Sequence, residues 1–124
     1  MVEIISKYMM INFDNCTVGK IWSGKSFSLI EADIIQFAQQ WDPQPFHACP
    51  ELAKNSYYGG ITAPSVYLFC IASKLFNDIG EFSGIGALKH EFEIAAPARA
   101  GDELTFNLTC IEKRASKSKD IIMK

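Results

Sequence analysis

The chain has 124 residues, of which 48% are hydrophobic and 21% are charged, and its formal net charge at pH 7 is −2. This length and composition predict one globular domain spanning residues 1–124 and exclude a disordered chain. Because nucleic-acid-binding domains carry a basic surface, the slight acidic excess argues against nucleic acid as a partner.

The first segment and the cysteines indicate the compartment. The opening stretch MVEIISKYMMINFDN lacks the basic region and the long apolar run of a signal peptide. The apolar run SVYLFCIASKLF has about 12 residues and includes a lysine, whereas a membrane span needs about 20. No CxxC pair occurs among the cysteines, which are Cys16, Cys49, Cys70 and Cys110. We therefore expect a cytoplasmic protein with reduced thiols and no membrane partner.

The first predicted helix is SLIEADIIQFAQQW, residues 28–41. Ser28 would cap it, and Glu31 three residues later would complete a capping box. Apolar side chains recur at steps of three and four residues and predict one buried stripe, formed by Ile34, Phe37, Ala38 and Trp41. Asp42 precedes Pro43 and is therefore pushed out of the α region, so the helix should end there.

Two more helices are predicted further along the chain. The stretch CPELAKNS, residues 49–56, favours a short helix with Pro50 near its first turn. Residues 57–60, Tyr-Tyr-Gly-Gly, form a flexible approach to the next helix, residues 65–76. That helix is apolar at nearly every angle, which is typical of a helix buried on all sides.

Two strands with period-two alternation follow. In residues 91–94, Phe92 and Ile94 alternate with glutamates, and in residues 104–110 every second side chain is apolar. The turn RAGDEL, closed by Asp102, would join the two strands as an antiparallel hairpin. A helix followed by antiparallel strands indicates an α+β fold in which a sheet curls around that helix.

The stretch WDPQPFHACP carries the residues with the most chemical potential. Asp42 and His47 are five positions apart, and the prolines between them restrict the backbone, so an acid and an imidazole are held at a set separation. The simpler interpretation is that Asp42 ends a helix and His47 lies in a loop. A metal site is not expected, because His47 and Cys49 have no third ligand nearby and zinc needs three or four.

These residues carry a resemblance. Asp42-Pro-Gln-Pro-Phe-His47, followed by YYGGITAPS and an apolar helix, resembles the hydratase motif of MaoC-like (R)-specific enoyl-CoA hydratases, Asp-x-Asn-Pro-aliphatic-His. INFDNCTVGK resembles the opening segment of that family, and IAAPARAGDELTFNLTCIEKRASKSK resembles its hairpin and the loop after it. The resemblance covers roughly residues 11–120. It implies a single hot-dog domain, an antiparallel sheet wrapped around a long buried helix.

The resemblance also implies a reaction, the interconversion of a 2-enoyl thioester and an (R)-3-hydroxyacyl thioester. Asp42 and His47 would be the acid/base pair acting through a water molecule. The backbone N–H of Ser65 would stabilise the charge on the thioester oxygen, Gly60 would belong to the same substrate-binding segment, and Ser73 would orient the substrate. The substrate would be a thioester of coenzyme A or acyl carrier protein, with no metal or redox cofactor.

The chain departs from the family pattern in a few places. Gln44 replaces asparagine and Phe46 replaces an aliphatic residue, which changes the shape of the pocket more than the acid/base capacity. Ser65 replaces glycine and adds a side chain beside the thioester. The sequence after KRASKSK is short, so the C-terminal strands are expected to be shortened.

Other functions stay open at this point. A non-catalytic hot-dog subunit could bind acyl-CoA or support a partner, and a hot-dog thioesterase would carry an acid on the central helix, where residues 65–76 have no Asp or Glu. The basic run of Lys113, Arg114, Lys117 and Lys119 is interpreted as a solvated tip, although it could attract the phosphates of coenzyme A. The fold implies a homodimer or higher homo-oligomer, which short chains with open sheet edges also favour.

Overall fold

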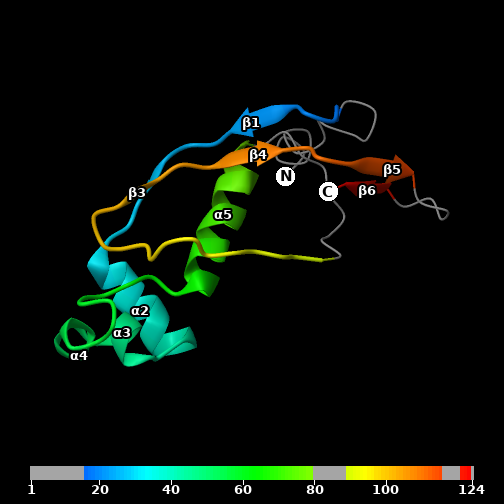
Figure 1. Ribbon diagram of the computed structural model, residues 1–124. Coiled ribbons are helices and arrows are strands. Elements are labelled where there is room, and N and C mark those ends of the chain that lie inside the picture. The colour runs from blue at the N-terminus through cyan, green and yellow to red at the C-terminus, as the bar shows by residue number, and fades with distance from the viewer. Residues whose placement is uncertain (1–15, 80–88, 116–120, 124) are drawn as a thin grey trace, which may run out of the picture. The chain divides into compact units, whose positions relative to one another are not determined.

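The computed structural model describes residues 16–79, 89–115 and 121–123 (Figure 1). The helices are α2 Glu31–Trp41, α3 Pro45–Ala48, α4 Pro50–Lys54 and α5 Ser65–Ile79. The strands are β1 Ile21–Ser23, β2 Phe27–Ser28, β3 Glu103–Leu104, β4 Asn107–Thr109, β5 Lys113–Ala115 and β6 Ile121–Met123. The chain divides into two compact units, one of Met1–Lys25, Leu75–His90 and Phe106–Lys124, the other of Ser26–Lys74 and Glu91–Thr105.

Helix α2 begins at Glu31, and the predicted capping box is wrong. Its N-cap is Ile30, with no side-chain hydrogen bond to the helix. Ser28 instead lies in β2, which pairs with β3 in the antiparallel register Phe27↔Leu104 and Ser28↔Glu103. There the Ser28 hydroxyl donates a hydrogen bond to the Glu103 carboxylate. Pairing with β3 keeps Ser28 extended, so its hydroxyl is directed at a neighbouring strand and not at the helix.

The buried stripe of α2 is mostly as predicted. Ile34 and Ala38 are fully buried, and Phe37 is half-buried with its ring stacked on Tyr67 at 4.8 Å between centroids. Trp41 is 67% exposed, so its assignment to the stripe is wrong. It is the last residue of the helix, where the chain turns away and nothing in the described residues covers the indole.

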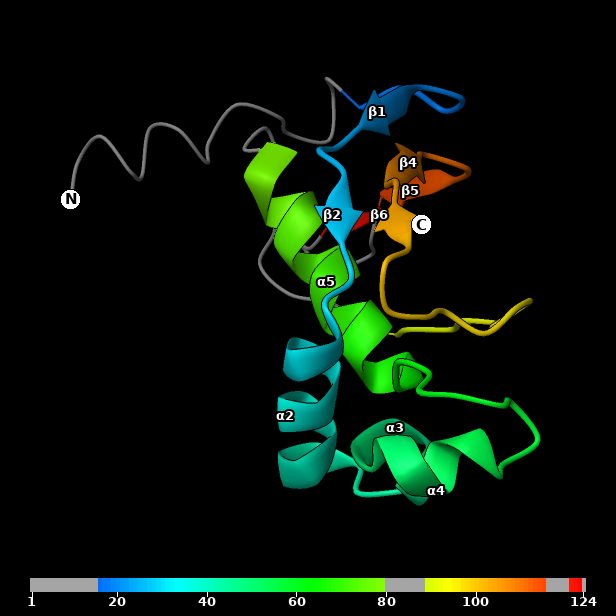
Figure 2. The same ribbon diagram turned by 90° about the vertical axis from the view of Figure 1, so that its left-hand side faces the viewer.

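The segment after α2 contains two short helices (Figure 2). The predicted end of α2 is confirmed, because Asp42 leaves the α region with φ −153° and ψ 74°. Helix α4 is also confirmed, with Pro50 as its first residue. Helix α3 was not predicted, although Pro45 opens it in the way that proline favours. Figure 2 shows α3 and α4 side by side with α2 next to them.

Helix α5 begins at Ser65 as predicted and runs to Ile79, beyond the expected end. Ile71 and Leu75 are buried at 4% and 3% exposure. The expectation that the helix is covered on every side is wrong. One stripe at helical spacing is exposed, made of Val66, Cys70, Ser73, Lys74, Asn77 and Asp78. The stripe gathers most of the polar side chains of the helix, so α5 is amphipathic and presents its polar face to solvent.

The predicted hairpin between residues 91–94 and 104–110 is wrong, because the structure assigns no strand to residues 91–95. Phe92 and Ile94 are 56% and 48% exposed. The later strands have other partners. β3 pairs with β2, and β4 pairs antiparallel with β1 in the register Ile21↔Thr109 to Ser23↔Asn107. Alternation shows which side chains share a face, but it cannot show which strand supplies the hydrogen bonds.

The predicted turn before β3 is confirmed. Asp102 accepts a hydrogen bond from the Arg99 backbone N–H at 2.9 Å and donates its own N–H to the Arg99 carbonyl at 3.1 Å. Gly101 has φ +89°, a conformation that favours glycine. Just before the turn, the Ala63 N–H donates to the Ala98 carbonyl at 2.8 Å, and Thr62 forms a β-bridge with Arg99. These contacts join the turn to the chain that leads into α5.

The unit that contains β1 and β4 has a small core of Cys16, Trp22 and Cys110, with Leu108 and Ile79 packed against it. Burial, together with a hydrogen bond to Cys110, raises the pKa of the Cys16 thiol. In the same unit β5 pairs antiparallel with β6, so the residues after the basic run form a further strand. Lys117 and Lys119 of that run lie outside the described residues. No described helix is long and apolar enough to span a membrane.

The Ser28–Glu103 contact can be tested by titration. The Ser28 hydroxyl, and then that of Ser26, lowers the pKa of the Glu103 carboxyl. A lowered pKa contributes stability that is present above the ordinary value and is lost as the pH falls through the folded-state value. We expect Ser28→Ala to raise the pKa of Glu103 toward its ordinary value, measured by carboxyl ¹³C NMR. An unchanged Glu103 titration would contradict the assignment, and the spectrum of α2 should stay unchanged because Ser28 does not cap it.

Candidate active site

Asp42 and His47 lie next to each other at the junction of α2 and α3. The distance from His47 Nε2 to Asp42 Oδ2 is 3.7 Å, and the two side chains are 10% and 26% exposed. Asp42 follows the last residue of α2, while His47 lies in α3, whose first residue is Pro45. The prolines end one helix and open the next, so the acid and the imidazole approach across a short turn. The structure therefore brings together the two residues that the sequence singled out.

Gln44 orients the acid. Its side-chain Nε2 donates a hydrogen bond to Asp42 Oδ1 at 3.1 Å, and its backbone N–H donates to the Asp42 carbonyl at 2.8 Å. One carboxylate oxygen is thus held by Gln44, and the other, Oδ2, faces His47. In the sequence Gln44 was a departure from the motif. In the structure its amide group still reaches the Asp42 carboxylate.

Thr62 orients the histidine and was missed by the sequence analysis. His47 Nδ1 lies 2.6 Å from the Thr62 carbonyl oxygen and 3.3 Å from Thr62 Oγ1. Thr62 is 3% exposed, and its own N–H donates to the Phe46 carbonyl at 3.0 Å. Since a carbonyl only accepts, the proton of the neutral imidazole is assigned to Nδ1. The signal in the sequence is a hydroxyl residue inside the otherwise apolar stretch GGITAP, residues 59–64.

This tautomer defines what the pair can do. With the proton on Nδ1, Nε2 of the neutral ring is an acceptor, and it faces a carboxylate oxygen that is also an acceptor. Two acceptors 3.7 Å apart do not bond to each other, but both can receive hydrogen bonds of about 2.8 Å from one water placed to the side. The arrangement is suited to hold a water by both of its O–H groups and to leave its lone pairs directed outward.

An aromatic wall adjoins the pair. The Phe46 ring meets the His47 ring edge-on with centroids 4.4 Å apart, and it meets the Tyr58 ring at 5.3 Å. Tyr57 lies perpendicular to Tyr58 at 5.4 Å and is 98% exposed. Phe46, which replaces the aliphatic residue of the motif, therefore restricts the space beside the imidazole.

The start of α5 offers backbone donors near this pair. Pro64 has no N–H, and its carbonyl accepts from Tyr67 N and Leu68 N at 3.0 and 3.1 Å. The N–H groups of Ser65 and Val66 have no acceptor within the described part of the chain. Ser65 comes three residues after Thr62, so it lies within about 10 Å of the residue that holds His47. Donors to a thioester oxygen are predicted from the sequence at this helix start, where the dipole is positive.

The other two predicted site residues are less closely connected to the pair. Gly60 is half-buried in the turn before Thr62, and a Cβ built there would lie 3.6 Å from Arg99 Nη1. Ser73 lies on the exposed stripe of α5, eight residues after Ser65. The contacts found for His47 are with Asp42, Thr62 and Phe46.

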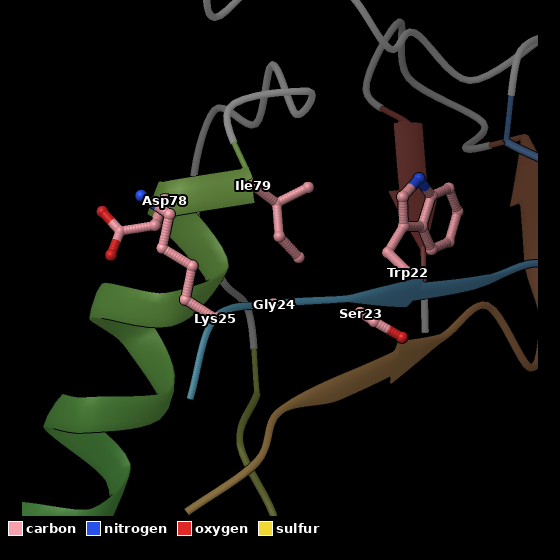
Figure 3. A pocket seen from close by; sticks show the side chains of 6 residues that line it. All are labelled: Trp22, Ser23, Gly24, Lys25, Asp78 and Ile79. Carbon is pink, nitrogen blue, oxygen red and sulfur yellow. The ribbon is translucent and has the colours of Figure 1, made fainter. Parts of the chain in front are cut away.

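The structure also contains a pocket of about 360 Å³ that no predicted site residue lines (Figure 3). Its lining comes from the chain around β1 and from the end of α5, and consists of Trp22, Ser23, Gly24, Lys25, Asp78 and Ile79. It has no histidine and is not the site of the chemistry discussed above. Within residues 16–79, 89–115 and 121–123, no group of three or more His, Cys, Asp or Glu side chains could hold a metal ion.

Comparisons with known proteins identify the relatives of this chain. Residues 14–123 match the protein family described as MaoC like domain. The chain is 25% identical over 111 residues to "Uncharacterized protein YdeM" of Bacillus subtilis (strain 168), covering 87% of this chain and 79% of that protein.

Two solved structures are similar over most of their length. The MaoC-like dehydratase from Rhodospirillum rubrum has a TM-score of 0.81 and 28% identity, and the match covers 91% of this chain and 80% of that one. The (R)-hydratase from A. caviae involved in PHA biosynthesis has a TM-score of 0.67 and 22% identity, with 79% and 74% covered. The hot-dog fold predicted from the sequence is thereby confirmed.

The tautomer of His47 is directly measurable. We expect ¹⁵N NMR of the neutral imidazole to show the proton on Nδ1, because the Thr62 carbonyl at 2.6 Å accepts it. The chain has two histidines, so the spectrum of His90→Ala assigns the remaining imidazole signals to His47. A neutral His47 with its proton on Nε2 would contradict the assignment and would remove the acceptor that faces Asp42.

Proposed function

Because the chain belongs to the family of MaoC-like domains, which includes a dehydratase and an (R)-hydratase among its solved relatives, we propose that it is a lyase acting on acyl thioesters. It interconverts a 2-enoyl thioester and an (R)-3-hydroxyacyl thioester. The observation that carries the proposal is the pair formed by Asp42 and His47, two acceptors 3.7 Å apart with the imidazole proton held on the far side by Thr62.

In the hydration direction, the pair binds one water between Oδ2 of Asp42 and Nε2 of His47. The water oxygen bonds to C3 of the enoyl group as the pair removes a proton from it. If His47 takes that proton, the imidazolium keeps its Nδ1–H bond to Thr62, which strengthens when the ring is charged. The pair then supplies a proton to C2, so that one water is added across the double bond. Dehydration follows the same steps in reverse.

The electrons displaced from the double bond move to the thioester carbonyl, which becomes enolate-like. The N–H groups of Ser65 and Val66 at the start of α5 are the donors that receive this charge, together with the positive end of the helix dipole. Donors that meet charge only in the transition state accelerate the step without holding the substrate too tightly. Gly60 and Ser73 are proposed to contact other parts of the substrate.

The reaction needs no metal or redox cofactor, because acid/base chemistry and backbone donors supply every step. The thioester carrier is coenzyme A or acyl carrier protein. The cysteines are free thiols, which supports a reducing, cytoplasmic compartment.

We also propose that the active form is a homodimer or a higher homo-oligomer. Phe92 and Ile94 are 56% and 48% exposed in a segment to which the structure assigns no strand, and Phe92 stacks on Phe69 at 5.6 Å. Exposed apolar side chains beside an extended backbone form a surface that a second copy can cover.

The catalytic proposal is tested with crotonyl-CoA and a longer 2-enoyl-CoA, by the loss of enoyl-thioester absorbance. We expect turnover by the native protein and a fall in kcat of about 10²- to 10⁴-fold in Asp42→Asn and in His47→Ala, which is the usual contribution of acid/base catalysis. The matched control is His90→Ala, which removes the other, exposed histidine and should keep its activity.

Two outcomes would reject the proposal. Turnover that survives both substitutions would exclude the pair as the acid and base. A folded, oligomeric protein without turnover on either substrate would favour a non-catalytic subunit that binds acyl thioesters or supports a partner chain.

The oligomer is tested by light scattering after size-exclusion chromatography. We expect at least a dimer for the native chain and a shift toward monomer in the double variant Phe92→Ser, Ile94→Ser. Ile30→Ser is the matched control, since Ile30 is 55% exposed elsewhere on the same unit and its loss should leave the mass unchanged. A native protein that is monomeric by light scattering would contradict the proposed oligomer.

A further inference from the structure

Arg99 is a half-buried cation without a carboxylate partner. Its Nη2 donates to the Tyr58 carbonyl at 2.7 Å, and its backbone N–H is taken by Asp102. No carboxylate of the described residues lies within salt-bridge distance of the guanidinium, and the Tyr58 carbonyl is the acceptor found for its N–H groups there. Guanidinium N–H groups form a planar fork that matches phosphate and carboxylate oxygens. The remaining donors are therefore available to an anion from outside the chain.

The backbone around Arg99 leaves it accessible. Gly60 has no side chain, and a Cβ there would lie 3.6 Å from Nη1 of Arg99, so a larger residue would cover the guanidinium. Gly59 has φ +67°, and a Cβ built on it would meet nothing within 4 Å. Glycine is used where the chain must allow close approach of a ligand as well as where it must turn sharply. In this turn Gly59 allows the sharp bend, and Gly60 leaves space beside the Arg99 guanidinium.

An exposed aromatic ring adjoins this turn. Tyr57 is 98% exposed, and it is held perpendicular to Tyr58, whose carbonyl binds Arg99. A ring with both faces in water is a stacking platform for a nucleobase. The Arg99 guanidinium, which can donate to a phosphate, and the Tyr57 ring therefore adjoin the same residue, Tyr58, although they come from different turns.

The same turn is connected to the catalytic pair. Tyr58 packs on Phe46, which packs on His47, and Thr62, which holds His47 Nδ1, forms a β-bridge with Arg99. A thioester that reacts at His47 would pass this turn on its way to solvent if its carrier arm follows the aromatic wall. The end of such an arm, in coenzyme A and in acyl carrier protein alike, is a phosphate.

We propose that Arg99 binds the phosphate at the end of the pantetheine arm of the thioester carrier, and that Tyr57 stacks on the adenine when the carrier is coenzyme A. The inference rests on the proposed function for the identity of the arm. It assigns the carrier phosphate to Arg99, in the turn before β3, and not to the basic run that includes Lys117 and Lys119.

The test compares substrates within each variant. kcat/KM is measured for crotonyl-CoA, for crotonyl-acyl carrier protein, and for the crotonyl thioester of N-acetylcysteamine, which lacks phosphate and adenine. We expect Arg99→Gln to lower the ratio of the coenzyme A value to the N-acetylcysteamine value by about tenfold, the usual effect of losing a charged hydrogen bond. Because each ratio is taken within one protein preparation, a partial loss of folded protein does not affect it.

The variants separate the phosphate from the base. Arg99→Lys should retain part of the ratio, since it keeps the charge without the fork. Tyr57→Ala should lower the ratio about fivefold for coenzyme A, as expected from lost stacking, and leave the acyl carrier protein ratio unchanged. The matched controls are Lys54→Gln, an exposed cation at the end of α4, and the pair Lys117→Gln, Lys119→Gln, and all should keep the native ratio.

An unchanged ratio in Arg99→Gln would overturn the proposal, and so would an equal fall in Lys54→Gln or in the Lys117, Lys119 variant. If Tyr57→Ala leaves the ratio of the coenzyme A value to the N-acetylcysteamine value unchanged, only the stacking part of the proposal is overturned. Calorimetric binding of free coenzyme A and of pantetheine keeps the test independent of turnover. If the protein is inactive, weaker coenzyme A binding in Arg99→Gln still supports the phosphate site, and no coenzyme A binding at all overturns it.

Discussion

The hydrogen bond from His47 Nδ1 to the Thr62 carbonyl is the contact on which the site depends. A buried imidazole without a partner would destabilise the fold by about 1–3 kcal/mol. The Thr62 carbonyl satisfies it at 2.6 Å and, by accepting the proton, leaves Nε2 free on the side of Asp42. The same bond meets a requirement of folding and a requirement of the chemistry that we propose. The arrangement of Asp42 depends on this bond too, because its Oδ2 faces an unprotonated Nε2 only in this tautomer.

Thr62 has this role because several chain segments meet at it. Its N–H bonds the Phe46 carbonyl in α3, its carbonyl bonds His47, and it forms a bridge with Arg99 in the turn before β3. Two residues later Pro64 accepts the first hydrogen bonds of α5. The acid/base pair, the donors at the start of α5 and the Arg99 guanidinium are therefore attached to one short stretch of backbone. Rigid support of this kind is what preorganised sites require.

The sequence predicts helix ends and turns well where neighbouring residues decide the backbone conformation. Proline ended α2 at Asp42 and opened α4 at Pro50, and glycine with an acid formed the turn at Asp102. The hydratase motif indicated the hot-dog fold, which the comparisons confirm. Predictions failed where a distant segment decided the outcome. Ser28 was assigned to a helix cap because its partner strand, with Glu103, lies 75 residues away in the chain.

By itself the sequence determined the family, the helix boundaries set by proline, and the short separation of Asp42 and His47 along the chain, because these follow from residue type and short spacing. Only the tertiary structure decided which nitrogen of His47 carries the proton, that Gln44 holds Asp42, and that Arg99 lies beside Gly60. A hydrogen bond to a backbone carbonyl has no side-chain signature, since every residue has that carbonyl. Thr62 binds the imidazole through its backbone carbonyl, so the residue type at position 62 does not predict this contact.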